Sequence, residues 1–259
     1  MKICITPREG LYQVLAAVFD AFDRVPTVAE LGVLKGDNAL QLHQALRPEQ
    51  LLLVDAWSAA SNAAYCPFEQ LPPWVTPVAE YAYYYGGPMD DPQTWERLYQ
   101  SCASKFEGHS EVSLIRQDSY SAYETVRQRV AGRGLDLLYV DANHQYEYVL
   151  RDLMTYQDLV RPDGLLMLND CCHSEKGARQ NLGVLEALGS FIKRSDFVPV
   201  AMTNTDWTDV VLARKGSHMV EAIDTVLVNA DIPFVELPHQ LITAARIRNG
   251  RLGANLSFC

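Results

Sequence analysis

An acidic residue and a histidine stand three positions apart, directly after a long apolar run. The run "LDLLYV" covers residues 135–140, Asp141 follows it, and His144 comes just before a segment with helical spacing. An imidazole titrates near neutral pH and can take a proton from a hydroxyl group. The pattern therefore fits general-base catalysis, although the pair alone leaves open that His144 is a surface histidine in the first turn of a helix.

Polar residues also follow four other apolar runs. In open α/β sheets, ligands bind outside the carboxyl ends of the parallel strands, so residues at these ends are expected to meet at one edge. Each residue taken singly could be a turn or a helix cap, but a coincidence at five successive strand ends is much harder to accept. The residues are Glu30, Gly32, Gly36, Asp37 and Asn38 after the first strand, Asp55 after the second, Asp118 and Ser119 after the third, Asp141 after the fourth, and Asn169 and Asp170 after the fifth.

The predicted edge is acidic, which limits the kind of cofactor that it could bind. A pyrophosphate cofactor needs N–H donors and few carboxylates, and the glycine pattern here is not GxGxxG. Gly32 and Gly36 would let the backbone come close to a ligand. S-adenosylmethionine fits better, because it carries a sulfonium and an amino group instead of phosphates. Asp55 is well placed for its two ribose hydroxyls.

The elements that must position these residues alternate along the chain. Apolar runs and helical patterns follow one another over residues 25–215, which predicts an α/β fold with a doubly wound, mostly parallel, seven-stranded Rossmann-like sheet. The last two runs are joined only by the short polar stretch around "NTD", so the last strand is expected to be antiparallel. Residues 1–24 are predicted to be an N-terminal helical segment and residues 216–259 a C-terminal extension.

A polar and aromatic stretch over residues 58–91 interrupts the alternation. It is predicted to fold over the acceptor pocket as a lid, since long loops in compact domains are often lids. Its aromatic side chains could stack on a sugar or on a flat ring; packing on the core or on another subunit is the alternative. These side chains are Trp74, Tyr81, Tyr83, Tyr84 and Tyr85.

Bulk properties exclude several classes of protein. The 259 residues carry a formal net charge of −10, which disfavours a nucleic-acid partner. No stretch has the length and apolarity of a signal peptide core or a membrane span. The six cysteines are scattered without a CxxC pair, as expected for a reduced, cytoplasmic protein. We expect a homo-oligomer that acts on a small molecule.

Four segments together resemble the successive motifs of a class I S-adenosylmethionine-dependent methyltransferase. More narrowly, they are similar to the macrocin-O-methyltransferase-like group, whose members depend on magnesium and methylate sugar hydroxyls of natural products. The resemblance covers residues 25–215, and its most specific part is Asp141 and His144 together with the pair at 169 and 170. The segments are "VAELGVLKGDNA", "LLLVDAW", "IRQDSYSA" and "LLYVDANHQYEYVLRDL…RPDGLLMLND".

The resemblance implies a role for each of these positions. Glu30 and Gly32 would face the methionine part of the donor, with Gly36, Asn38 and Asp141 also in the donor site. Asp55 would hold the ribose, and Asp118 and Ser119 would lie beside the adenine. Asp141, Asn169 and Asp170 would bind Mg²⁺ or another divalent cation, and His144 would be the base. Asn169 departs from the group, where an acid is usual, but an amide oxygen can still bind magnesium.

Several alternatives stay open at this point. His173, in "NDCCHS", is a rival base or a further ligand. A catechol- or phenol-directed O-methyltransferase is the nearest alternative activity; such enzymes use a lysine as the base, and the histidine here favours a sugar. A nucleotide-binding Rossmann oxidoreductase and a non-catalytic donor-binding relative are the others.

Overall fold

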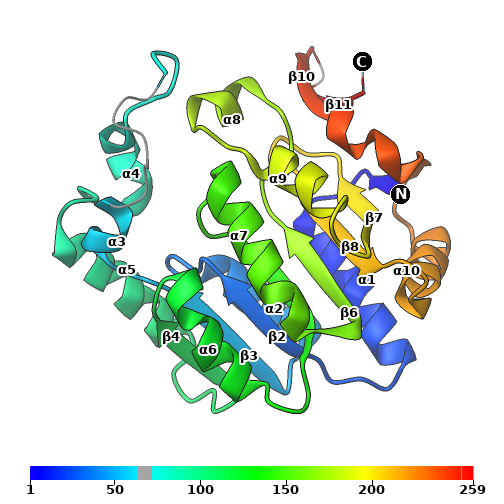
Figure 1. Cartoon of the computed structure of the whole chain (residues 1–259), viewed down its shortest axis with the longest axis horizontal. Helices are drawn as coiled ribbons and strands as arrows, with labels where there is room; N and C mark the ends of the chain where they lie inside the picture. Colours follow the sequence, from blue (N-terminus) through cyan, green and yellow to red (C-terminus); the bar gives the residue numbers. More distant parts are fainter. Residues whose placement is uncertain (64–71, 252, 259) are drawn as a thin grey trace.

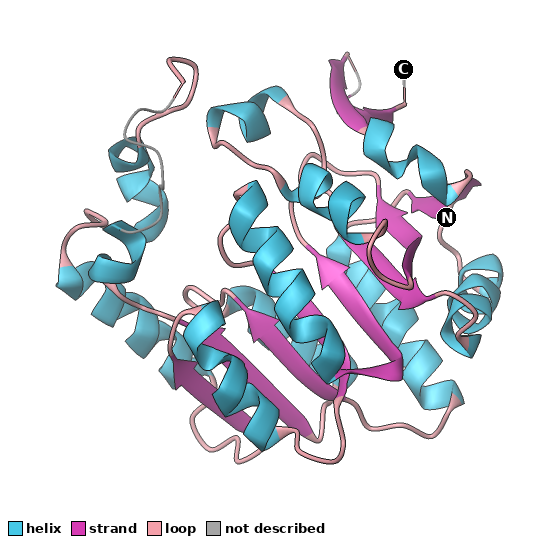
Figure 2. Ribbon diagram, in the orientation of Figure 1, coloured by secondary structure: helices cyan, strands magenta, loops and turns pink. Residues whose placement is uncertain are grey.

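The computed structural model describes residues 1–63, 72–251 and 253–258, and within them the chain alternates between strands and helices (Figures 1 and 2). The strands are β1 (Lys2–Cys4), β2 (Thr27–Leu31), β3 (Gln50–Asp55), β4 (Val112–Arg116), β5 (Leu135–Val140), β6 (Val160–Leu168), β7 (Phe197–Thr203), β8 (Val210–Arg214), β9 (Phe234–Glu236), β10 (Arg246–Gly250) and β11 (Gly253–Ser257).

The α-helices are α1 (Arg8–Ala21), α2 (Asp37–Leu46), α3 (Ala59–Ala63), α4 (Ala82–Tyr85), α5 (Pro92–Lys105), α6 (Ser119–Arg129), α7 (Tyr146–Tyr156), α8 (Glu175–Arg179), α9 (Val184–Phe191) and α10 (His218–Asn229). Short 3₁₀ helices cover Val78–Tyr81, Gln157–Leu159 and His239–Ala244. The predicted lid, residues 58–91, contains α3, the first 3₁₀ helix and α4, and its residues 64–71 lie outside the described part.

The central sheet has nine strands in the order β4-β3-β2-β5-β6-β8-β7-β1-β9. The predicted α/β class and the antiparallel pairing of β7 with β8 are confirmed, but the predicted number of seven strands is wrong. The two additional strands, β1 and β9, each have only three residues and pair with each other beside β7. Runs this short lack the alternation that would mark a strand in the sequence.

Two apolar cores cover the two faces of the sheet, because successive side chains of a strand point to opposite faces. In β2, Val28 packs with α1, α2, α5 and α10, whereas Ala29 and Leu31 pack with α6, α7 and α9. Figure 1 shows α6, α7 and α9 in front of the sheet and α1 and α2 behind it. This double cover is the doubly wound arrangement that the alternation predicts.

The strand order reverses at the centre of the sheet. The chain continues from β2 to β3 on one side and returns to β5 on the other, so β2 and β5 are parallel neighbours. The segments that follow them stay adjacent, because the Asp141 N–H donates to the Leu31 carbonyl over 2.8 Å. A crevice beside such a reversal is where open α/β sheets bind ligands. Among the described helices, none combines the length and apolarity needed to span a membrane.

Candidate active site

His144 lies within reach of two carboxylates beyond the ends of β5 and β6. Its Nε2 is 3.2 Å from Asp141 Oδ1 and 3.9 Å from Asp170 Oδ2. This nitrogen is buried and has no hydrogen-bond partner. Burial acts to lower the pKa of His144, but the charge of Asp170 and the contact with Asp141 outweigh it, and the pKa is raised. The predicted proximity of Asp141, His144 and Asp170 is therefore present in the structure.

Asn169 is buried and turns its amide toward a third acid, Asp209. Asn169 Nδ2 donates to Asp209 Oδ1 over 3.2 Å, and the Tyr139 hydroxyl donates to the same oxygen over 2.7 Å. Burial raises the pKa of Asp209 to about 6, against the opposing charge of Arg8. With the amide nitrogen on Asp209, the Asn169 side chain keeps its oxygen as an acceptor.

Arg8, at the first position of α1, is the cation of this acidic site. Its Nε lies 3.4 Å from Asp209 Oδ2, its Nη1 lies 4.0 Å from Asp141 Oδ2, and the same Nη1 donates to Asn38 Oδ1 over 3.3 Å. One guanidinium thus contacts groups that follow β5, open α2 and precede β8. It offsets part of the negative charge of the three acids Asp141, Asp170 and Asp209.

The sequence reasoning missed both Arg8 and Asp209, and each carries a recognisable signal. Arg8 follows β1, the short strand that was not predicted, and a basic residue in the first turn opposes the helix dipole unless it has another partner. Asp209 precedes β8 instead of ending a strand. Because β8 is antiparallel to β6, with Leu168 opposite Val210, its amino end lies at the edge where β6 ends.

Glu30, one of the predicted donor-site residues, has a buried carboxyl with one free oxygen. It is fully buried in β2, its Oε1 accepts from Asn38 Nδ2 over 2.9 Å, and its Oε2 has no hydrogen-bond partner. The Tyr12 hydroxyl donates to Asn38 over 2.6 Å and fixes the amide. Burial raises the pKa of Glu30 well above its usual value, and the charge of Asp141 adds to the effect. An unpartnered buried carboxylate oxygen indicates a place for a cationic group.

Gly32 and Gly36 are both required by the backbone. Their φ angles are +86° and +82°, in the left-handed region that favours glycine. A Cβ on Gly32 would lie 2.1 Å from the Asp141 carbonyl oxygen, and a Cβ on Gly36 would lie 2.9 Å from the Cys102 sulfur. The first glycine lets the segment after β2 pass close to Asp141, and the second is the N-cap of α2.

Asp55 holds the loop after β2 together. Its Oδ2 accepts from the backbone N–H groups of Val33 and Leu34, each over 2.9 Å, and its Oδ1 accepts from Trp57 over 2.8 Å. Burial still raises its pKa, although these three donors oppose the change. Its predicted ribose contact therefore has to coexist with a structural role and stays a prediction.

Asp118 and Ser119 lie at the start of α6. Their contact with the adenine of the donor stays a prediction. Asp118 is the N-cap, and its carboxylate accepts from the backbone of Tyr120 and Ser121 and from the Ser121 hydroxyl. Ser119 Oγ accepts from Arg151 Nη2 over 3.1 Å. Asp118 thus has the capping role that was the simpler interpretation of a strand-end acid.

Two further predicted groups differ in their position. His173 pairs with Glu186, with Nδ1 3.5 Å from Oε1, and its side chain is half exposed; it forms no ion pair with Asp141 or Asp170. Tyr84, in the predicted lid, is 60 % exposed as a residue, yet the pKa of its phenol is raised by desolvation and then by the charges of Asp141 and Asp170. The lid backbone is bonded to α8, because the Thr76 N–H donates to the Arg179 carbonyl over 2.8 Å.

The residues at this edge fit a hard divalent cation in their chemistry. Carboxylates and amide oxygens are the ligands that magnesium takes, and Asp141, Asn169 and Asp170 offer these. The negative charge of the three acids is larger than the positive charge of Arg8. The buried His144 Nε2 also lacks a hydrogen-bond partner. Among the described His, Cys, Asp and Glu side chains at this edge, no three offer ligand atoms that all lie within 4.8 Å of one another.

Comparisons with known proteins agree with this fold. The O-methyltransferase TomG from Streptomyces achromogenes, in complex with SAM, superposes with a TM-score of 0.53 and 16% identity, over 80% of each chain. An O-methyltransferase from Bacillus cereus, in complex with SAH, superposes with a TM-score of 0.50 and 10% identity, over 81% of this chain and 82% of that one. At these identities the likeness shows the fold. No curated protein sequence matches the chain.

The family of the chain follows from its sequence profile. The methyltransferase domain family matches residues 29–171, which is more than half of the chain and runs from β2 to the loop after β6. This range includes the predicted donor residues and the pair at 169 and 170, and it decides against the oxidoreductase alternative. The chain belongs to the methyltransferase domain family.

Proposed function

We propose that the protein is a magnesium-dependent O-methyltransferase that uses S-adenosylmethionine to methylate a hydroxyl group of a small molecule, a sugar of a natural product. The observation that supports this most directly is the buried imidazole of His144, whose Nε2 lies 3.2 Å from Asp141 and 3.9 Å from Asp170. The proposal needs a base, a cation site and a donor site at one edge of the sheet, and these residues would supply all three.

His144 would act as the base. In the neutral imidazole with its proton on Nδ1, Nε2 would accept the proton of an acceptor hydroxyl placed next to it. Asp141, 3.2 Å away, would stabilise the imidazolium that results. When bound, the cation on Asp141, Asn169 and Asp170 would lower the pKa of the hydroxyl and fix its orientation, and the donor would provide the methyl group.

Glu30 and Arg8 would position the donor and the acids. Glu30 Oε2 is buried without a hydrogen-bond partner, and a donor ammonium placed beside it would offset the cost of ionising a buried carboxyl. Arg8 contacts Asp141, Asp209 and Asn38. It would keep these side chains in place while leaving Asp170 free of a guanidinium contact.

The acceptor would approach from the lid side. Trp74 and Tyr83 are strongly exposed, and Tyr84 lies within the field of Asp141 and Asp170. Aromatic faces of this kind stack on sugars and on flat rings alike. A phenol therefore remains the second candidate acceptor, and the imidazole base favours the sugar.

The test measures the demethylated donor product with a panel of sugar glycosides and catechols, with magnesium and with EDTA. We expect turnover with a sugar hydroxyl, loss of turnover in EDTA and recovery on adding magnesium. Full activity in EDTA would remove the metal from the mechanism, and a preference for catechols would replace the sugar. Donor binding that is weakened at least tenfold by Glu30→Gln, without turnover of any acceptor, would identify a non-catalytic donor-binding relative.

A further inference from the structure

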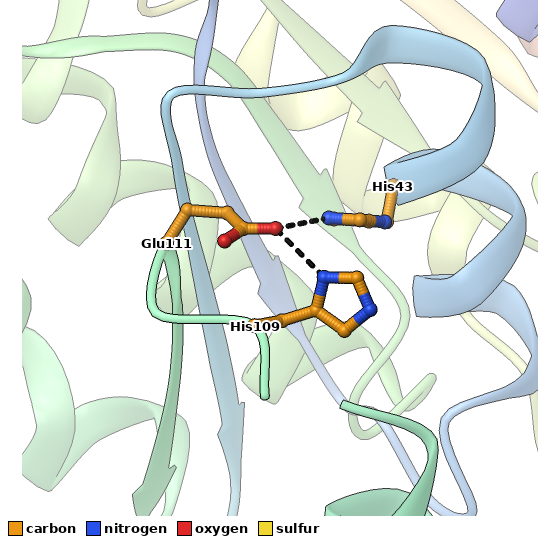
Figure 3. Close-up of side chains that lie close together, drawn as sticks. All are labelled: His43, His109 and Glu111. Carbon is orange, nitrogen blue, oxygen red and sulfur yellow. Dashed lines mark hydrogen bonds and ion pairs between the residues drawn. The ribbon is translucent and has the colours of Figure 1, made fainter. Parts of the chain in front are cut away.

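A second cluster of metal-ligating side chains lies at the opposite edge of the sheet. Figure 3 shows His43 and His109 with a ring nitrogen of each turned toward one carboxylate oxygen of Glu111. His43 Nε2 is 2.7 Å and His109 Nδ1 is 2.9 Å from Glu111 Oε1. The three ligand atoms all lie within 4.8 Å of one another, the only such set of His, Cys, Asp and Glu side chains among the described residues.

We propose that His43, His109 and Glu111 form a zinc-binding site, separate from the proposed active site and serving to tie α2 to the turn before β4. Two imidazole nitrogens and one carboxylate are a ligand set that zinc takes with a water molecule in the fourth position. Magnesium prefers oxygen ligands, so the two histidines favour zinc. The cluster is therefore selective for a different ion from the one proposed at the other edge.

The backbone holds all three residues before any ion arrives. His43 is in the last turns of α2. The His109 N–H donates to the Phe106 carbonyl over 3.1 Å, and the His109 carbonyl accepts from Val112 over 3.1 Å. The Glu111 carbonyl accepts from the Leu51 N–H over 2.9 Å, which fixes it to β3. Fixed ligand positions reduce the entropy lost when a metal binds.

The surroundings shield one side of the cluster and leave the other open. The buried ring of Phe106 packs edge-on against both imidazoles, with centroids 6.0 Å from His43 and 6.4 Å from His109. The His43 side chain is 16% exposed, that of Glu111 29% and that of His109 42%. An ion could enter from the His109 side, and a water could complete its coordination there.

The charge state of the cluster also suits a cation. Glu111 brings a carboxylate whose Oε1 lies within hydrogen-bond distance of both imidazoles. In a tetrahedral site with bonds of about 2.0–2.1 Å, ligand atoms lie roughly 3.3 Å apart. Each nitrogen would therefore move away from Glu111 Oε1 by about half an ångström, which a small rotation of the exposed His109 ring allows.

The test titrates zinc into the metal-free full chain by calorimetry, followed by anomalous diffraction at the zinc edge. We expect micromolar or tighter binding, a peak among the three side chains, and at least a tenfold loss of affinity in His109→Ala and in Glu111→Gln. His218→Ala, which removes another exposed histidine, should bind zinc as the unmodified protein does. Binding should also persist in His144→Ala, whose imidazole lies at the other edge.

Two results would overturn the proposal. One is zinc affinity that is unchanged in both His109→Ala and Glu111→Gln; the other is no uptake of zinc at micromolar concentrations by a folded protein. In either case the cluster would be a hydrogen-bonded carboxylate with two histidines and no more. A failure here leaves the proposed methyl transfer untouched, because the two sites share no residue.

Discussion

The two histidine clusters lie at opposite ends of the strands of one sheet. They differ in whether their polar atoms have hydrogen-bond partners. At the carboxyl edge, His144 Nε2 and Glu30 Oε2 are buried without a hydrogen-bond partner. At the amino edge, His43, His109 and Glu111 satisfy one another and are partly exposed. Buried polar groups without partners are costly, so the first edge is suited to ligands that supply the missing partners. At the second edge, a metal has to replace hydrogen bonds that already exist.

Replacing the proposed base, His144, should give the largest difference in kcat between variants at the two ends of the sheet. His144→Ala should lower kcat by about 10²–10⁴-fold, the usual contribution of a positioned base, and should leave the Kd of the donor nearly unchanged. His218→Ala, which removes an exposed histidine outside both sites, is the matched control and should keep full turnover. Equal loss of kcat and of donor affinity in His144→Ala would mean that the residue is structural.

A third unpartnered buried atom, Asp152 Oδ2, tests whether such atoms always mark a ligand site. Asp152 lies in α7, bonded to Arg151, and burial raises its pKa to about 6. Well below pH 4 the carboxyl is protonated in both the folded and the unfolded chain. Between about pH 4 and pH 6 the unfolded chain ionises while the folded chain keeps its proton, so the folded state loses stability over this range and no more above it. Asp152→Asn should therefore raise the free energy of unfolding by about 2–3 kcal/mol at pH 8.

The same variant should show little gain near pH 3, where most molecules of both states keep the proton. Chemical denaturation at the two pH values measures the difference, with donor affinity as the second measurement. Unchanged donor affinity would mean that Asp152 has no part in the ligand site and that its burial with α7 only lowers the stability of the fold. A loss of donor affinity would instead place it with Glu30 in the ligand site.

Placing an acid at position 169 should have a smaller effect. It should lower the stability of the metal-free protein and increase the stabilisation by magnesium. Asn169→Asp removes the donor to Asp209 Oδ1, now 3.2 Å away, and puts two carboxylates side by side. We expect the metal-free protein to lose about 1–3 kcal/mol of stability and magnesium to raise its Tm more than it raises that of the unmodified protein. An unchanged magnesium response would argue that position 169 is not a ligand.

Much of the carboxyl edge could be predicted because its signals are local. Asp141 and His144 are three residues apart, and Asn169 directly follows an apolar run, so the end of a buried strand places each of them. Asp118 shows the limit of the same rule, since its carboxylate caps α6. A strand-end acid can hold its own backbone or a ligand, and the sequence does not distinguish the two.

The sequence by itself determined the alternation of strands and helices from β2 to β8, the buried faces and the acidic edge, because apolar periodicity and strand ends are properties of neighbouring residues. Only the tertiary structure decided that β8 enters between β6 and β7, which brings Asp209 to Asn169. The same holds for Arg8, which meets Asp209 across the fold, and for His43, which meets Glu111 68 positions away. Such contacts depend on strand order and direction, which bring together distant segments. No sequence pattern in either segment predicts that the two meet.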